Sequence, residues 1–317
     1  MKIVHVLAGL SEASGICQVA RRFAAAQAKA GDAAAFVAPR FKWNPTYFSF
    51  AFVVRAVRAV RAADEVWVNG SWTFPVWFGA FLAKRFKKRL VVLPSGSFAP
   101  RSLHNHAAWK KRLVAPFDRR VLRAADEVLA LCDAEADWIR AFEPSARVRR
   151  AQVPTFYDGV PVRPVAARAE GRPLRVLFLG RAEDPLKGVR YLRAAVEELN
   201  AAAPAEAPRV ELRVESSLFG AAKEAAWTWC DVLCLPTLSE NYGLVVAEAL
   251  EHGVPAVTTD GAPAWRGVPH VVWLDGFCAA TDAQRVQMLK SALPCLHKRG
   301  KTDILRDQSE GLKGFLT

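Results

Sequence analysis

Short apolar runs that alternate with amphipathic stretches are the feature of this 317-residue chain that most constrains its fold. Residues 2–7 have the pattern of a buried strand, and apolar side chains then recur at helical spacing over residues 14–31. Strands that alternate with helices predict parallel sheets covered by crossover helices, hence an α/β fold. Further strands are predicted at 65–68, 90–93, 128–131, 148–153, 175–179, 210–214, 232–235 and 255–258, and further helices at 74–89, 110–123, 133–142, 189–202 and 244–251.

The chain is longer than one compact core usually requires, and its apolar content of 52% is ample for two cores. Prolines and the lack of an apolar period mark residues 159–173 as a linker. We therefore predict two doubly wound parallel-sheet domains, 1–158 and 174–292, and a tail of unclear structure at 293–317. Because open parallel sheets bind ligands at the carboxyl ends of their strands, we expect the two domains to face each other across a cleft.

Positive charge is concentrated in the first half of the chain. Residues 1–165 carry 26 Lys and Arg against 12 Asp and Glu, whereas residues 166–317 carry 18 against 19. This surplus predicts an anionic partner: a membrane surface, a phosphorylated acceptor or a nucleic acid. Basic residues mixed with Trp109 and Phe117 favour the membrane over solvated helix ends. No recognised nucleic-acid module appears, so we expect no nucleic-acid partner.

The cysteines and the N-terminal sequence indicate the cellular compartment in which the protein is expected. The six cysteines lack metal-site spacing and the density of a disulfide scaffold, and Cys230 and Cys234 fall at a predicted buried strand, so we expect reduced thiols. The chain begins directly with a strand pattern, and arginines interrupt its most apolar stretch, 47–54. We therefore expect a cytoplasmic protein, peripheral on the inner face of the cell membrane, that crosses no bilayer.

One strand-loop-helix segment, 235–250, has the pattern of an anion site. Gly243 precedes a helix that begins at Leu244, where free backbone N–H groups and the positive end of the dipole meet, which suits a diphosphate. Glu240 precedes this helix and Glu248 lies inside it, roughly 6–8 Å further along. The two carboxylates are therefore expected to hold groups at the two ends of a ligand rather than to act as an acid–base pair. The alternative is two solvated acids on a helix.

Two basic residues are expected at the same edge of the second sheet. Arg181, next to Gly180, follows the first strand of that domain, and Lys187 precedes the next helix. Both can neutralise charge on a departing diphosphate. The acids between them, Glu183 and Asp184, have no third ligand at useful spacing, so we interpret them as exposed turn residues and expect no metal.

The run Ser239 to Glu248 resembles the E-x7-E segment of retaining glycosyltransferases of the GT-B fold, family GT4 (glycosyl transferases group 1). The resemblance implies two Rossmann-like domains that transfer a sugar from a nucleotide-sugar donor to a hydroxyl of a glycan or glycolipid, in lipopolysaccharide or surface polysaccharide biosynthesis. It also implies retention of the anomeric configuration and no metal or cofactor. The implied catalytic residues are Arg181, Lys187 and Glu240, and the implied donor-binding residues are Gly15, Gly180, Asn241, Tyr242, Gly243, Leu244 and Glu248.

The resemblance extends more weakly over the first domain. Two of its loops are similar to acceptor-side loops of the family, which implies acceptor contacts from Asn69, Trp72, Ser95 and Gly96. Many relatives have histidine where this chain has Asn69 and Ser95. The span 214–227 is expected to be too short for the full nucleotide-base pocket, and the tail too short for the usual C-terminal helices.

Two other classes of function remain open at this point. One is another nucleotide enzyme, either a dehydrogenase or a sugar-nucleotide epimerase. Gly9 and Gly15 lie six residues apart, which does not match the G-x-G-x-x-G spacing of dinucleotide sites. The other is a non-catalytic protein, either a basic nucleic-acid binder or a degenerate glycosyltransferase.

Overall fold

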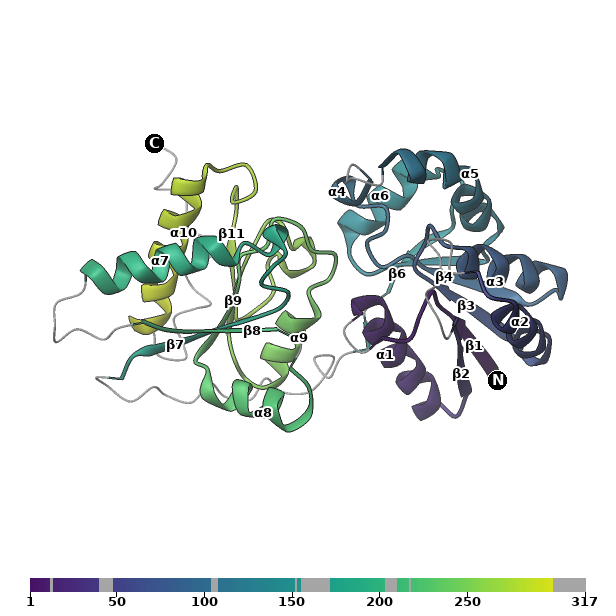
Figure 1. Cartoon of the computed structure of the whole chain (residues 1–317), viewed down its shortest axis with the longest axis horizontal. Coiled ribbons are helices and arrows are strands. Elements are labelled where there is room, and N and C mark those ends of the chain that lie inside the picture. The colour runs from purple at the N-terminus through teal and green to yellow at the C-terminus, as the bar shows by residue number, and fades with distance from the viewer. Residues whose placement is uncertain are drawn as a thin grey trace. The chain divides into compact units, whose positions relative to one another are not determined.

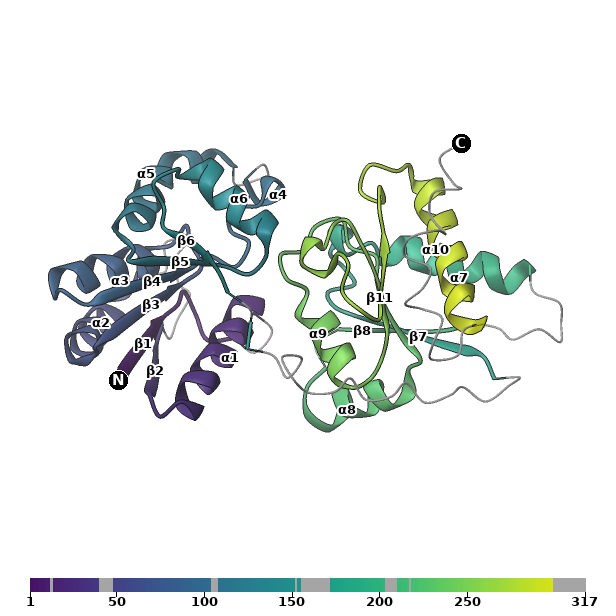
Figure 2. The ribbon, with the colours of Figure 1, turned by 180° about the vertical axis from the view of Figure 1, so that it is seen from behind.

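The computed structural model describes residues 1–11, 14–39, 48–103, 108–151, 153–154, 172–202, 210–216 and 218–298. The chain divides into two compact units, Met1–Thr155 and Phe156–Thr317, each with its own sheet (Figures 1 and 2). The predicted linker at 159–173 lies outside the described residues except for Arg172 and Pro173.

The first unit is built on a six-stranded sheet in the order β2, β1, β3, β4, β5, β6, with every neighbouring pair parallel. Its elements are β1 (Lys2–Val6), α1 (Gly15–Lys29), β2 (Ala33–Val37), α2 (Phe50–Ala62), β3 (Glu65–Asn69), α3 (Phe74–Arg85), β4 (Arg89–Leu93), α4 (Pro100–Leu103), α5 (Ala108–Ala124), β5 (Glu127–Ala130), α6 (Asp133–Phe142) and β6 (Val148–Arg150).

Side chains alternate across this sheet because successive residues of a strand point to opposite faces. Val4 and Val6 belong to the cluster that includes buried residues of α2, α3, α5 and α6. The tilted rings of His5 and Trp67 contact each other at a centroid distance of 5.1 Å, and Trp67 also contacts Phe23 of α1. The strands are apolar on both faces because helices cover both, as parallel sheets require.

The second unit has a five-stranded parallel sheet in the order β11, β10, β9, β7, β8. Its elements are β7 (Leu174–Leu179), the 3₁₀ turn η1 (Pro185–Lys187), α7 (Val189–Ala202), β8 (Val210–Glu215), α8 (Gly220–Trp229), β9 (Val232–Leu235), α9 (Leu244–Glu251), β10 (Ala256–Thr259), the 3₁₀ turn η2 (Pro263–Trp265), β11 (Val271–Leu274) and α10 (Asp282–Lys298).

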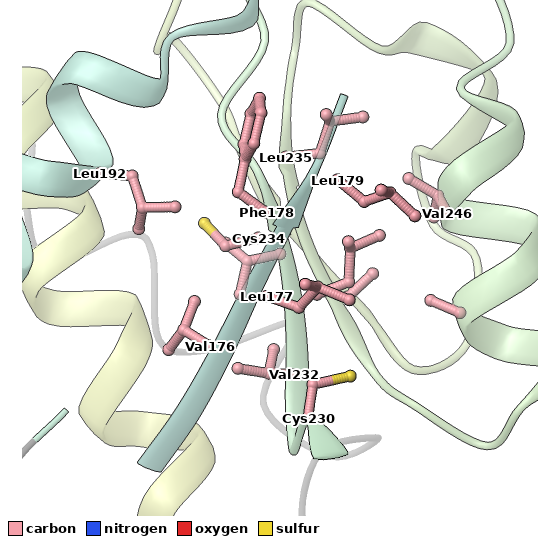
Figure 3. Packing of buried hydrophobic residues seen from close by; sticks show 14 of the residues in the cluster. Val176, Leu177, Phe178, Leu179, Leu192, Cys230, Val232, Cys234, Leu235 and Val246 are labelled. Atoms are coloured by element: carbon pink, nitrogen blue, oxygen red, sulfur yellow. The ribbon is translucent and has the colours of Figure 1, made fainter. Parts of the chain in front are cut away.

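The core of this second unit packs on both faces of β7, which lies between β9 and β8. Figure 3 shows Phe178 on the side of Leu192 from α7, whereas Leu179 lies on the side of Val246 from α9. All four side chains are at most 6% exposed. Together the two sheets confirm the predicted α/β fold with two doubly wound parallel sheets.

Several element predictions need correction. The helix predicted at 74–89 ends at Arg85, and Arg89 instead begins β4, where it pairs with Glu65 at 2.7 Å and with Glu127 at 3.0 Å. Helix α10 runs to Lys298, so the first part of the tail predicted at 293–317 is helical, and residues 299–317 lie outside the described residues. The strands β2 and β11 and the helices α2, α4, α8 and α10 were not predicted.

Five of the six cysteines are described; all five are reduced, and four of them are buried. Cys234 lies in β9 as predicted, whereas Cys230 caps the end of α8, two residues before that strand. Burial raises the pKa of the Cys230 thiol to about 12, so it stays protonated at neutral pH. Within the described part of the chain, no helix combines the length and apolar character needed to span a bilayer.

Candidate functional site

The strand order of the second unit defines where its ligand site is expected. From β7 the chain crosses to β8 on one side, and it then returns to β9 on the other side. Such a switch point leaves the loops after β7 and β9 next to each other at the carboxyl edge, where open α/β sheets bind ligands. Hydrogen bonds join the two loops directly, because Leu238 N donates to Leu186 O at 2.7 Å and Thr237 Oγ1 to the same oxygen at 3.1 Å.

Lys187 and Glu240 meet at this edge, although they are 53 residues apart in the chain. The ammonium group of Lys187 donates to a carboxylate oxygen of Glu240. The two side chains are only 12% and 22% exposed, so solvent screens their attraction weakly. The switch point therefore holds a cation and an anion that come from different loops.

Two glycines allow this close packing of loops. Gly188 has a left-handed backbone with φ of +67°, and a Cβ there would overlap the carbonyl oxygen of Pro236. A Cβ at Gly261, after β10, would overlap the carbonyl oxygen of Thr237. Neither position accepts a side chain without displacing the β9 loop that carries Glu240.

The head of α9 completes the candidate site. Gly243 caps this helix with φ of +76°, and a Cβ there would lie 3.1 Å from Trp265 Nε1. The Trp265 indole N–H donates to the Tyr242 carbonyl, which fixes the turn before the helix. Leu244 and Val245 open the helix, and the first N–H groups of any helix have no intrahelical acceptor. This end of α9 therefore suits an anionic group.

The remaining predicted donor residues have partners of their own. Arg181 is 67% exposed at its side chain and pairs with Asp184 at 2.9 Å. Asp184 also accepts the N–H of Leu186 at 3.0 Å and caps η1, so the prediction that it is an exposed turn residue is wrong. Glu248, within α9, pairs with Lys223 of α8 at 2.7 Å. Gly180 N donates to Glu215 O at 2.9 Å, which holds the end of β7 against β8.

In the first unit, Trp72 follows β3 with a left-handed backbone of φ +64°. Its backbone N–H donates to one oxygen of Asp118 at 3.0 Å, and its indole N–H donates to Ser97 O at 3.1 Å. The other oxygen of Asp118 accepts the indole N–H of Trp77 at 3.0 Å. Burial raises the pKa of Asp118 to about 6, because these two hydrogen bonds only partly offset the loss of hydration.

The loop after β4 has a comparable support. Ser95 and Gly96 have left-handed backbones, with φ of +51° and +81°. The buried carboxylate of Glu135 accepts the N–H of Gly96 at 2.5 Å and that of Leu131 at 2.7 Å. Two loops at neighbouring strand ends are therefore each held by a buried carboxylate from a later helix.

Asn69 and Gly15 form no hydrogen bond with Asp118 or Glu135 among the contacts described. Asn69 is 1% exposed, and its amide nitrogen lies 3.3 Å from Trp67 O and 3.4 Å from Val6 O, so the structure buries it within the sheet. Asn69 Oδ1 and Ser95 Oγ are buried without a hydrogen-bond partner among the described residues. Gly15 begins α1, and a Cβ there would meet nothing within 4 Å.

Sequence reasoning missed four residues that support the loops or pair with predicted site residues: Asp118, Glu135, Lys223 and Trp265. Asp118 is the only acid in the very basic helix α5, which was a usable signal. Glu135 lies in the first turn of α6, where a carboxylate is expected to bind backbone N–H groups. Lys223 and Trp265 had no distinguishing pattern.

Models of known protein families match both units of the chain. The family model described as "Glycosyl transferase 4-like domain" matches residues 4–155, and that described as "Glycosyl transferases group 1" matches residues 173–299. An MMP alpha-(1->4)-mannosyltransferase from Mycolicibacterium hassiacum is 27% identical in an alignment of 197 residues that covers 54% of this chain and 46% of the relative. The match therefore spans about half the length of that curated relative.

Solved structures are similar over nearly the whole chain. Anabaena Alr3699/HepE, determined with UDP and glucose, aligns with a TM-score of 0.59 at 15% identity and covers 99% of this chain and 100% of its own. A sucrose-phosphate synthase from Thermosynechococcus elongatus aligns with a TM-score of 0.62 at 16% identity, over 94% of this chain and 92% of its own. Both likenesses concern the fold. Because the two family models together account for both units in this order, the chain belongs to the GT-B fold glycosyltransferases of family GT4.

Proposed function

We propose that this protein is a retaining glycosyltransferase that moves a sugar from a nucleotide-sugar donor to a hydroxyl of a glycan or glycolipid. The contact between Lys187 and Glu240 beside the head of α9 carries the proposal. A lysine and free helix N–H groups suit a diphosphate, and a carboxylate next to them suits sugar hydroxyls. The mannosyltransferase relative and the neighbour solved with UDP and glucose support a nucleotide-sugar donor.

In this proposal the second unit binds the donor. Lys187, with Arg181 released from Asp184, neutralises the departing diphosphate, which sits at the backbone of Gly180, Gly243 and Leu244. Glu240, Asn241 and Tyr242 orient the sugar as it gains oxocarbenium character, and Glu248 accepts the ribose diol. Because two side-chain cations and a helix end supply the positive charge, the reaction proceeds without a metal.

The acceptor is proposed to bind the first unit, at the loops after β3 and β4. Support comes from the buried oxygens of Asn69 and Ser95, which have hydrogen-bonding capacity not used by the described residues. Trp72 lies in the loop after β3 and Gly96 in the loop after β4, and both are proposed to contact the same acceptor. A lipopolysaccharide or surface polysaccharide precursor at the inner face of the cell membrane matches the positive charge of residues 1–165.

Product analysis with an isotopically labelled nucleotide sugar and an alkyl glycoside acceptor tests this function. We expect NMR spectroscopy to show labelled glycoside with the anomeric configuration of the donor, in equal amount with and without EDTA. A product of inverted configuration would exclude the retaining reaction. Isomerised donor without any glycoside would instead favour the sugar-nucleotide epimerase alternative.

A further inference from the structure

Three helices of the first unit, α2, α3 and α5, form one surface with large apolar side chains exposed to solvent. Helix α3 packs against both α2 and α5, so the three lie side by side (Figure 1). We call this surface the α2–α3–α5 face. Its exposed large apolar residues are Phe50, Phe81, Trp109, Leu113 and Phe117. Exposed apolar side chains that gather in this way indicate an interaction surface.

The charge of the α2–α3–α5 face has a single sign. The helices α2, α3 and α5 contain three, two and six Lys and Arg residues, respectively. Their single acid, Asp118, is 2% exposed and points to Trp72 and Trp77. Every exposed charged side chain on these three helices is therefore a cation, which complements an anionic partner and excludes a basic one.

The apolar and basic residues of α5 are arranged as in helices that lie in a membrane interface. Trp109, Leu113 and Phe117 recur every four residues along about 12 Å of one face. Their exposed fractions are 60%, 68% and 55%. Lys110 and Arg112 lie beside this stripe, with the Lys110 ammonium 5.4 Å from the Trp109 ring centroid. A cation-flanked apolar stripe with a tryptophan is typical of helices that lie in the headgroup region of a bilayer.

The inner face of α5 contacts the candidate acceptor loop. Asp118 accepts the backbone N–H of Trp72, and the Lys111 ammonium lies 5.8 Å from the Trp72 ring centroid. Phe117 stacks on Trp77 of α3 at 5.1 Å, which ties the stripe to the neighbouring helix. The same helix thus presents an apolar stripe outward and holds Trp72 inward.

We propose that the α2–α3–α5 face docks on an anionic lipid bilayer, with Trp109 and Leu113 of α5 entering the headgroup region. Docking on the bilayer depends only on this surface. The effect of docking on acceptor binding rests on the proposed function, because a bilayer at α5 places the headgroup of a membrane-bound acceptor beside the Trp72 loop.

Flotation of the full chain with vesicles tests the docking. Vesicles of phosphatidylcholine with about one-third phosphatidylglycerol are expected to bind the protein, and pure phosphatidylcholine vesicles to bind it at least about tenfold more weakly. The double charge reversal K110E/R112E should weaken binding to the anionic vesicles at least about twentyfold. The control R193E/R266E makes the same charge change on exposed residues of the second unit and should alter binding by less than about threefold.

The apolar contribution needs a separate variant. W109S/L113S keeps every charge and should weaken binding at least about tenfold, whereas Phe219→Ser removes a 44%-exposed apolar side chain of the second unit and should leave binding unchanged. Thermal unfolding checks that all variants fold. Equal binding to neutral vesicles, equal losses in test and control variants, or salt-dependent binding to RNA with none to vesicles would each overturn the proposal. Donor hydrolysis, measured without vesicles, reports the proposed function independently.

Discussion

The ammonium group of Lys187 contacts the carboxylate of Glu240, and the two residues come from loops that follow different strands of the second sheet. Each charge occupies the place where the proposed donor would bind. A bound diphosphate competes with Glu240 for Lys187, and sugar hydroxyls compete with Lys187 for Glu240. The two charges therefore neutralise each other in this structure, and we expect a nucleotide sugar to replace both halves of this ion pair.

Replacing Lys187 by alanine should lower donor turnover by at least about 100-fold, because the cation that stabilises the leaving diphosphate is lost. Steady-state hydrolysis of the preferred nucleotide sugar measures this. Lys290→Ala is the matched control, since Lys290 forms a 2.8 Å ion pair with Glu198 elsewhere in the same unit. Equal effects of the two changes would remove Lys187 from the reaction.

Glu240→Gln should separate binding of the nucleotide from use of the sugar. The amide no longer holds Lys187 by charge, so affinity for the nucleoside diphosphate alone should stay equal or rise, whereas turnover of the sugar nucleotide should fall about tenfold or more. Isothermal titration calorimetry and turnover assays give the two quantities. Glu198→Gln is the control. A parallel loss of diphosphate affinity would contradict the assigned division of roles.

Gly188→Ala should destabilise the second unit more than Gly267→Ala does. Both glycines have positive φ, +67° and +72°, so the cost of a left-handed alanine is the same, about 1 kcal/mol. At Gly188 the added methyl group also overlaps Pro236 O, whereas nothing lies within 4 Å at Gly267. Urea unfolding should show a further loss of at least about 2 kcal/mol for Gly188→Ala. Similar unfolding free energies would mean that the two loops are less tightly packed than described.

Asp118 should make the stability of the first unit depend on pH. Its pKa is raised from 3.8 to about 6, so the folded chain binds more protons than the unfolded chain between these values. The free energy of unfolding therefore falls as pH rises through this window, by up to about 3 kcal/mol. Asp118→Asn has no such group, so the stability of the wild type relative to this variant should fall from pH 4 to pH 7.

Urea unfolding of both proteins across this range measures that difference. Asp137→Asn provides a control, because the side chain of Asp137 is 76% exposed on the same unit. Curves for the wild type and Asp118→Asn that stay parallel across the window would show that the carboxyl of Asp118 is not desolvated as described.

The sequence predicted the fold well where the strands are rich in valine, isoleucine or leucine. β1 and β9 fall within a residue of their predicted bounds, because buried parallel strands are continuous apolar runs. β2 was missed, since it begins with three alanines, a residue that favours helices, and lies at the edge of its sheet. Lys187 and Glu240 lie at the carboxyl edge of the second sheet, as the sequence predicted.

The contacts within the candidate site were harder to predict. The sequence predicted that Lys187 neutralises the diphosphate and that Glu240 binds the sugar, but it did not predict that the two side chains pair, because spacing along the chain does not show that side chains from two loops touch. The pairing of Glu248 with Lys223 depends on how α8 packs beside α9, and Lys223 lies in a helix without a motif. The supports of Trp72 and Gly96 come from α5 and α6, at least 39 residues further along the chain.

Hydrolysis of a panel of UDP-, GDP- and ADP-sugars, with and without EDTA, tests whether the second unit binds and uses a nucleotide-sugar donor. We expect slow release of sugar from one donor, unaffected by EDTA and abolished in Lys187→Ala and Arg181→Ala, while circular dichroism shows that both variants remain folded. A chain that neither binds nor hydrolyses any member of the panel, with or without EDTA, would contradict this expectation.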